Sequence, residues 1–284
     1  MERMARERIR HEMAFRHVTV AAVDHVTPTM VRVTLRGDEL AGFAADGPSD
    51  HVKVYFPDPA TGVLTAPTWD ADGVHRPTDG IVISRDYTPR AFRPEGSIAA
   101  GSPAELDLDF VLHGGDGGRA GGPASAWAAG AAVGDELVVG GPRGSLLAPT
   151  EVGHALLIAD ETGLPAFSRW LELLPASARI TAVLLADDDA TEDYLDEAQR
   201  ARASVEWLFR FDGPGQLEES VHSIDTDAID YVWAAGEAGE LTPVRRMLKH
   251  ERGIGPDRMQ LQGYWRRGVT NLDHHAPLDP SDPD

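Results

Sequence analysis

The chain of 284 residues contains no cysteine. This absence excludes disulfide bonds, and it also excludes iron–sulfur clusters and zinc sites that use thiolate ligands. Any redox chemistry must therefore come from a bound cofactor rather than from a thiol or a cluster.

Long apolar runs are also missing. The longest ones, such as Ala182–Ala186 and Ala155–Ala159, fall far short of the ~20 residues that a helix needs to cross a bilayer. Residues 1–14 interleave arginine with glutamate, and no apolar segment of a secretion signal follows them. We therefore expect a cytoplasmic protein without membrane insertion, whose N-terminal leader is frayed or helical.

Basic residues are few. Lysine plus arginine total 26 against 46 aspartates and glutamates, a formal charge of −20, and lysine occurs only at positions 53 and 249. An acidic surface of this kind excludes nucleic acid or an anionic membrane as the main partner. Hydrophobic residues make up 42% of the chain, which is enough for a core, and the length suits two domains or one large one.

The charge is unevenly distributed. Segment 187–197 holds seven acidic residues and no lysine or arginine, whereas segment 245–267 holds seven basic residues against two acidic ones. Ordinary helix-surface charge explains the basic segment. The alternative is a cationic patch that binds an anionic ligand, and the sequence leaves both open.

The first half of the chain has the period of two that is typical of strands. Gly, Pro and Asp clusters separate the apolar alternations. Six strands are predicted, over Phe15–Val23, Met30–Leu35, His51–Phe56, Ile81–Tyr87, Glu105–Phe110 and Glu136–Val139. Six antiparallel strands with turn signals predict a small barrel over residues 15–147.

The second half alternates strands with helices over residues 148–275. Strands are predicted at 154–159, 179–186, 205–210, 231–235 and 258–265, and helices at 164–174, 191–201, 216–223 and 241–251. This order predicts a doubly wound parallel sheet with helices on both faces, whose ligands bind at the carboxyl ends of the strands. The Pro- and Asp-rich tail 276–284 is predicted to be disordered.

Three clusters could carry chemistry. Ser84–Arg90 combines arginines, an aromatic ring and a hydroxyl at a strand end, which suits a flat cofactor with a phosphate tail. A Gly-rich stretch leads through Gly122–Ser125 into a helix whose first N–H groups could bind phosphate. Asp160–Pro165 lies where a nucleotide would bind, but no GxGxxG fingerprint is present. Each cluster alone is also explained as an ordinary strand end, flexible loop or helix cap.

Taken together, the motifs resemble the siderophore-interacting protein family of flavin-dependent ferric-siderophore reductases, which are related to ferredoxin reductases. The matching segments occur in family order from about Phe15 to Gly268. They are 49–57, 85–90, 108–113, 122–127, 134–137, 141–145, 160–166, 233–238 and 263–268.

The resemblance implies a β + α/β protein, with an N-terminal six-stranded antiparallel FAD-binding barrel followed by an NAD(P)H-binding domain. Thr88 is implied to lie near flavin N5 and, with Glu237 on the nicotinamide side, to be catalytic. The cofactor-binding residues implied by the family motifs are Arg85, Tyr87, Thr88, Arg90, His113, Gly122, Pro123, Ala124, Ser125, Trp127, Asp160, Glu161, Thr162, Gly236, Glu237 and Ala238.

Two departures from the family pattern are visible. Residues 116–121 form a small insertion between His113 and the Gly122–Ser125 turn, where family members usually have a shorter stretch. Gly163 stands where alanine is usual.

The family uses basic residues near the flavin to hold anionic siderophores. This role carries over to Lys53, with Arg266 and Arg267 as further candidates, although Lys53 equally reads as an outward strand residue. Iron belongs to the substrate, and no protein metal site is expected.

The resemblance predicts an NAD(P)H-dependent reductase of ferric siderophores, and separately we expect a monomer. A general flavin reductase and a non-catalytic flavoprotein that binds an iron chelate are the alternatives. NADH against NADPH stays open, because the acids at 187–189 disfavour a 2′-phosphate whereas the basic residues of 245–252 could accept one.

Overall fold

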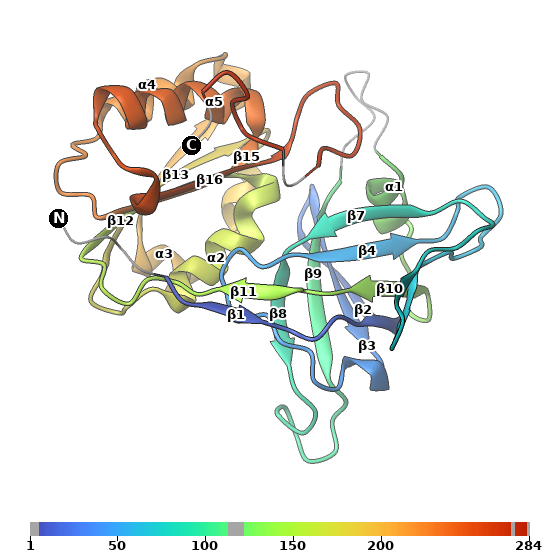
Figure 1. Cartoon of the computed structure of the whole chain (residues 1–284). Helices are drawn as coiled ribbons and strands as arrows, with labels where there is room; N and C mark the ends of the chain where they lie inside the picture. The colour runs from blue at the N-terminus through green and yellow to red at the C-terminus, as the bar shows by residue number, and fades with distance from the viewer. Residues whose placement is uncertain (1–5, 113–121, 274–275, 283–284) are drawn as a thin grey trace. The chain divides into compact units, whose positions relative to one another are not determined.

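The computed structural model describes residues 6–112, 122–273 and 276–282 (Figure 1). The chain forms two compact units, one of residues 8–147 and one of residues 148–284 together with 1–7.

The first unit is built on an antiparallel sheet of seven strands within its described residues. The order is β7-β4-β10-β2-β3-β9-β8. The strands are β2 (Phe15–Thr27), β3 (Met30–Arg36), β4 (Val52–Phe56), β7 (Ile83–Tyr87), β8 (Pro89–Arg93), β9 (Glu105–Val111) and β10 (Glu136–Gly140). The edge strands β7 and β8 follow one another in the chain with only Thr88 between them, so the sheet must curl into a barrel whose two edges meet at Thr88.

This architecture confirms the predicted antiparallel barrel but corrects its strand number. All six predicted strands are present, and β8 is an additional one. Its sequence begins with Pro89, which lacks an N–H donor and is tolerated because β8 lies at the sheet edge. Only one residue separates β8 from β7, so the sequence contains no turn signal between the two strands. This is why the sequence pattern predicted six strands instead of seven.

A ladder of charges holds this edge on the side opposite the apolar core. In β9 the buried Glu105, Asp107 and Asp109 alternate with the core residues Leu106, Leu108 and Phe110. Arg32 of β3 makes a two-pronged bond to Asp109 at 2.7 and 2.8 Å. Arg93 of β8 makes another to Asp107 at 2.6 Å for each nitrogen. Because such forked charge-assisted bonds are both strong and directional, they fix β8 to β9 and with it the position of Thr88.

Smaller elements complete the unit. They are η1 (Asp38–Leu40), the hairpin β5 (Thr68–Asp70) and β6 (Gly73–His75), and helix α1 (Pro123–Ala129). Strand β1 (Arg8–Arg10) pairs antiparallel with β11 (Gly144–Leu146), so the prediction of a frayed or helical leader is wrong for this part of the chain. The backbone of β1 gains hydrogen-bond partners from β11, and the alternating charges in its sequence do not indicate this pairing.

The second unit confirms the doubly wound α/β prediction. Within its described residues, five parallel strands lie in the order β14-β13-β12-β15-β16. They are β12 (His154–Asp160), β13 (Arg179–Ala186), β14 (Ser204–Phe209), β15 (Tyr231–Glu237) and β16 (Met259–Trp265). The helices are α2 (Leu164–Leu173), α3 (Glu197–Arg202), α4 (Gln216–Ser223) and α5 (Ala238–Arg246), which continues as a π-helical turn, Met247–Glu251.

Helices cover both faces of this sheet (Figure 1). Trp170 of α2 packs on Tyr231 and Trp233 of β15, whereas the intervening Val232 and Ala234 pack with α4 and α5 on the other face. The predicted helix 191–201 is instead a 3-10 turn, η3 (Asp189–Tyr194), followed by α3. The break falls before Asp196, whose side chain caps α3 by accepting from Gln199 N–H.

The prediction of a disordered tail is wrong for residues 276–282. Leu278 is 8% exposed and packs into the core between the sheet and the α4–α5 layer. Asp279 binds Arg246 at 2.5 Å, and Asp282 binds Lys249 at 2.9 Å and Arg245 at 3.1 Å. Hydrogen bonds from Lys249 and His250 lower the pKa of Asp282 to about 2. The basic patch around 245–249 therefore binds the acidic tail of its own chain.

Leu278→Ala tests whether the tail is part of the fold. Removing a buried leucine side chain should lower the free energy of unfolding by about 2 kcal/mol, the low end of the usual range because a terminal segment can relax. Chemical denaturation measures this change. Leu173→Ala is the control, since Leu173 is 41% exposed. Equal losses in the two variants would contradict the docked tail.

Candidate cofactor and substrate sites

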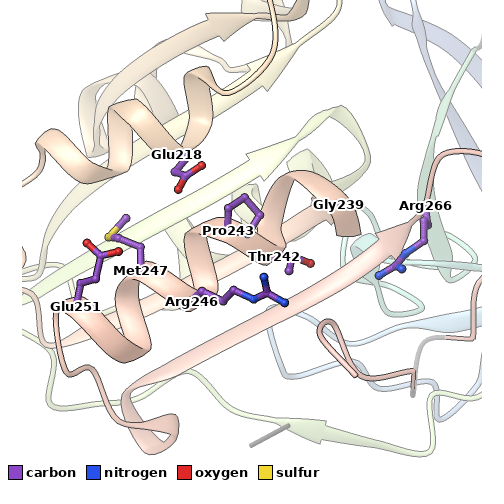
Figure 2. A pocket seen from close by; sticks show the side chains of 8 residues that line it. All are labelled: Glu218, Gly239, Thr242, Pro243, Arg246, Met247, Glu251 and Arg266. Atoms are coloured by element: carbon purple, nitrogen blue, oxygen red, sulfur yellow. The ribbon is translucent and has the colours of Figure 1, made fainter. Parts of the chain in front are cut away.

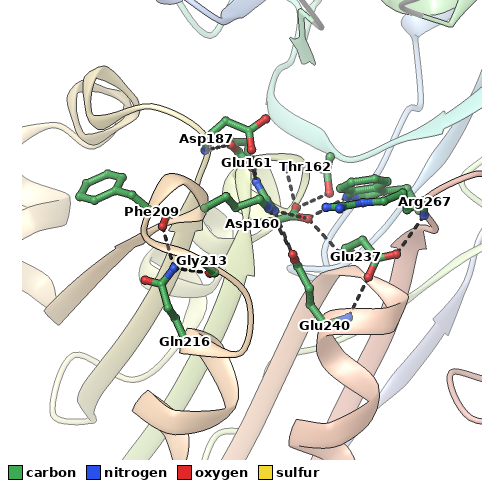
Figure 3. A network of polar contacts seen from close by, with 12 residues as sticks. Asp160, Glu161, Thr162, Asp187, Phe209, Gly213, Gln216, Glu237, Glu240 and Arg267 are labelled. Carbon is green, nitrogen blue, oxygen red and sulfur yellow. Dashed lines mark hydrogen bonds and ion pairs between the residues drawn. The ribbon is translucent and has the colours of Figure 1, made fainter. Parts of the chain in front are cut away.

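The carboxyl ends of β12 and β15 form the point at which the strand order of the second unit reverses. These strands are hydrogen-bonded neighbours although β13 and β14 come between them in the chain. Ligands of open parallel sheets bind at such a switch point. The structure therefore brings the two predicted nicotinamide-side segments, Asp160–Thr162 and Gly236–Ala238, to the same edge (Figure 3).

The Asp160 carboxylate ties this edge together. Its Oδ1 accepts from Thr162 N at 2.9 Å and from Thr162 Oγ1 at 2.6 Å. Its Oδ2 accepts from Glu237 N at 2.9 Å and from Trp265 Nε1 at 2.7 Å. Asp160 is 4% exposed. One buried side chain therefore links β12, β15 and β16, and it positions the backbone of the site.

Two glycines permit this close packing. A Cβ at Gly236 would lie 2.8 Å from Asp160 Oδ2, and a Cβ at Gly163 would lie 2.8 Å from the Ala235 carbonyl oxygen. Both distances are shorter than carbon and oxygen atoms tolerate. Glycine at position 163 thus allows η2 (Glu161–Gly163) to approach β15 closely.

Glu237 uses both carboxylate oxygens within the protein. Its Oε2 accepts from Glu240 N at 2.7 Å and so caps the first turn of α5, and its Oε1 accepts from Arg267 N at 2.9 Å. The residue is 6% exposed. Its geometry is that of a residue that positions α5 and the Arg266–Arg267 segment, and its predicted catalytic role stays a prediction.

Sequence reasoning missed Arg210, which directly follows β14. Its Nη1 lies 2.8 Å from Glu161 Oε2, and Asp187 N–H also donates to Glu161. Burial lowers the pKa of Arg210, but Glu161 and other carboxylates outweigh it, so the pKa lies above its ordinary value and the guanidinium stays charged. Burial raises the pKa of Glu161, against the opposing effect of Arg210. The sequence does show that Arg210 ends a predicted strand of the parallel sheet, and this position at a carboxyl strand end could have identified it as a site residue.

In the barrel, the Arg85–Arg90 motif lies at the seam where the edges meet. Arg85 and Tyr87 are register partners of the core residues Val54 and Val52, so they lie on the inner face of β7. The Tyr87 ring centre is 4.4 Å from that of Phe110, and burial raises the pKa of the Tyr87 hydroxyl. Thr88 is buried at 7% exposure. Arg85 and Tyr87 thus lie on the inner face of the barrel, and the Tyr87 ring packs against its aromatic core.

Helix α1 contacts β4 and β7 and brings Gly122–Ser125 and Trp127 to the same wall. The Trp127 ring lies 5.4 Å from Phe56 and 5.6 Å from Phe110. Among the described residues no side chain caps the start of α1, and a Cβ at Gly122 would meet open space. His113 lies outside the described residues.

These donors fit the implied flavin dinucleotide. Two arginines, Arg85 and Arg90, are half-buried on the strands that meet at Thr88, and helix α1, which contacts β7, begins there with no side-chain cap among the described residues. Guanidinium groups and helix N-termini are the groups that proteins use to bind a pyrophosphate.

Lys53 lies on the opposite, outer face of β4. Its register partner is Asp86, and Lys53 Nζ lies 2.6 Å from Asp86 Oδ1. The lysine side chain is 38% exposed. The predicted substrate residue is therefore accessible, but it is paired with a carboxylate and points away from Arg85 and Tyr87.

Arg266 contacts the docked tail. Its Nη2 and the Thr242 hydroxyl both donate to the Leu278 carbonyl, at 3.2 and 3.3 Å. A cavity of about 530 Å³ opens beside them along α5 (Figure 2). Its lining comprises Glu218, Gly239, Thr242, Pro243, Arg246, Met247, Glu251 and Arg266.

Residues 6–112, 122–273 and 276–282 contain no group of three or more histidine, aspartate or glutamate side chains arranged to hold a metal ion. In the same part of the chain, no helix has the length and apolar character needed to cross a membrane.

Asp160→Asn tests whether the Asp160 carboxylate holds the ends of β12, β15 and β16 together. An amide has one acceptor oxygen in place of two, so donors on β15 or β16 lose their partner. The free energy of unfolding should fall by about 2 kcal/mol, as for hydrogen bonds to a buried charge. Thermal and chemical denaturation measure it, with the exposed Asp227→Asn as the control. A stable Asp160→Asn protein would show that the donors find other partners.

Comparison with known proteins covers both units. Residues 19–146 match the model of the siderophore-interacting FAD-binding domain, and residues 152–268 match that of the siderophore-interacting protein family.

Individual relatives span nearly the whole chain. The NADPH-dependent ferric-chelate reductase of Escherichia coli is 33% identical over 91% of this chain and 96% of its own length. Ferric vibriobactin reductase ViuB of Vibrio cholerae is 30% identical over 88% and 89%. The crystal structure of a siderophore utilization protein from T. fusca matches with a TM-score of 0.83 and 39% identity, over 96% of this chain and all of that one. The chain belongs to the siderophore-interacting protein family.

Proposed function

We propose that this protein is an NAD(P)H-dependent, FAD-containing reductase of ferric siderophores, which acts as a monomer in the cytoplasm and releases iron as Fe(II). Both family models match, and two relatives that cover 91% and 88% of the chain are named as ferric-chelate and ferric vibriobactin reductases. The observation that carries the proposal is the Arg85–Arg90 motif at the barrel seam, beside the start of α1.

The barrel residues would hold the flavin dinucleotide. Arg85, Arg90 and the first turn of α1 would bind its phosphates, and Thr88 would donate its hydroxyl to the ring system. Bound flavin supplies the chemistry that converts a two-electron hydride donor into a source of single electrons. The charge ladder of β3, β9 and β8 keeps Thr88 in place for this role.

The second unit would bind the nicotinamide nucleotide at its switch point. Asp160 and Glu237 hold the backbone there, so the ends of β12 and β15 present a fixed surface to the ligand. Iron is the substrate: reduction of Fe(III) to Fe(II) weakens its bonds to hard oxygen ligands, and the siderophore then gives up the metal.

An anaerobic titration tests the function. The purified protein should show an oxidised flavin spectrum that bleaches on addition of NADH or NADPH, and a ferric siderophore should restore it while ferrozine traps Fe(II). Bleaching that ferric chelates do not reverse would favour a general flavin reductase. A spectrum that neither nucleotide bleaches would favour a flavoprotein carrier, and a colourless protein that takes up no FAD would contradict the proposal.

Lys53 and Asp86 allow a paired test of substrate binding. Lys53→Ala should raise the KM for an anionic ferric chelate by about threefold, the effect of ~0.7 kcal/mol for a partly exposed charge. Asp86→Asn should lower it, because the lysine loses its neutralising partner. Steady-state kinetics with an uncharged ferric chelate serve as the control, since neither change should matter there. An unchanged KM in both variants would assign Lys53 a structural role.

A further inference from the structure

The ends of β13 and β14 carry acidic and basic side chains of the kind that distinguish NADH from NADPH in doubly wound sheets. In doubly wound sheets, an acidic residue after the second strand binds the adenosine 2′-hydroxyl of NADH, whereas a nearby arginine accommodates the 2′-phosphate of NADPH. β13 is the second strand of this sheet in chain order, and it ends in Ala186 followed by three consecutive aspartates, Asp187–Asp189.

Arg210 is the basic residue at this edge, and it is already fully engaged. Ala186 and Phe209 are register partners, so Asp187 and Arg210 emerge side by side. Arg210 Nη1 lies 2.9 Å from Asp187 Oδ1, and its Nη2 lies 3.4 Å from Asp160 Oδ2 and 3.4 Å from Glu240 Oε2. With Glu161 as the fourth partner, one cation is surrounded by four carboxylates.

This cluster repels a phosphate. Its formal charge is −3, and the Arg210 side chain is only 14% exposed. A phosphate monoester carries about −1.5 to −2 charges at pH 7. Binding a 2′-phosphate here would require displacing a carboxylate from Arg210 and bringing like charges together, which is a strong source of specificity.

The same edge is suited to a 2′-hydroxyl. The Asp187 side chain is 58% exposed, and a carboxylate accepts hydrogen bonds from ribose hydroxyls. Phe211 stacks on Phe209 with ring centres 5.3 Å apart and is 69% exposed, which offers an aromatic surface for a purine ring. An adenosine without a 2′-phosphate therefore finds both a polar and an apolar contact.

Four other basic residues of the unit, Arg245, Arg246, Lys249 and Arg200, have partners away from this edge. Arg245, Arg246 and Lys249 bind the aspartates of the docked tail. Arg200 of α3 donates to the Glu192 carbonyl at 2.9 Å and lies 3.3 Å from Asp193.

We propose that Asp187 and the carboxylates around Arg210 make this protein prefer NADH over NADPH. The inference rests on the proposed function of the same unit. It sets this chain apart from the relative whose name specifies NADPH.

Two measurements test the inference on the full-length protein. Calorimetric titration with ADP-ribose and with 2′-phospho-ADP-ribose needs no turnover, and it should show about tenfold or more weaker binding of the phosphorylated ligand. Steady-state assays with ferricyanide should give the same order for kcat/KM with NADH and NADPH. If neither nucleotide supports turnover, the reductase function fails while the binding ratio still tests the inference.

Variants identify the residues. Asp187→Asn should reduce the discrimination against the 2′-phosphate several-fold, whereas Asp193→Asn should not, although it removes one charge from the same acidic run and its side chain is 81% exposed. Phe211→Ala should weaken both ligands equally and leave their ratio unchanged. Equal or tighter binding of 2′-phospho-ADP-ribose by the unaltered protein, or an unchanged ratio in Asp187→Asn, would overturn the proposal.

Discussion

The second unit depends on one buried carboxylate. Asp160 ends the first strand of the sheet and accepts hydrogen bonds from the next turn, from the end of β15 and from the indole of β16. A charge removed from water must be paired or fully hydrogen-bonded, and here the donors come from several elements that must therefore meet. Gly163 and Gly236 leave the space in which they do so. The ends of β12, β15 and β16 are therefore held together by the hydrogen bonds that stabilise this buried charge.

In the barrel, hydrogen-bonded carboxylates also hold the strands, and here they set the position of the edge strand β8. Its sheet has two edges, and the chain passes from one to the other through the single residue Thr88. Apolar packing inside the barrel excludes a shift of β8 along β9 by one residue, but a shift by two would keep the same side chains on the inner face. The forked bond from Arg93 of β8 to Asp107 does fix it, since it requires a particular partner, and the forked bond from Arg32 in turn holds β9 to β3. The charge ladder on the outer face of β3, β9 and β8 thus holds the Arg85–Arg90 motif in position.

Several of the basic side chains in this protein form ion pairs with carboxylates of the same chain. The basic segment around 245–249 binds the aspartates of the tail, and Arg210 is enclosed by acids. Lys53 has Asp86 as its partner. A chain with 46 acidic and 26 basic side chains has enough carboxylates to neutralise each of these cations. The cationic patch that the sequence offered for anionic ligands is thus largely a docking surface for the protein's own C-terminus.

The sequence by itself determined the class of each half, because strand alternation and the strand–helix rhythm are local patterns of apolar residues. It also placed Asp160–Thr162 and Gly236–Ala238 at strand ends, and the motif order identified the family. Only the tertiary structure decided which side chains those ends face. Arg210 and Trp265 reach Asp160 from 50 and 105 residues away in the chain, and nothing local in the sequence encodes such contacts. The same holds for β1, for β8 and for the tail, whose order comes from partners distant in the sequence rather than from their own composition.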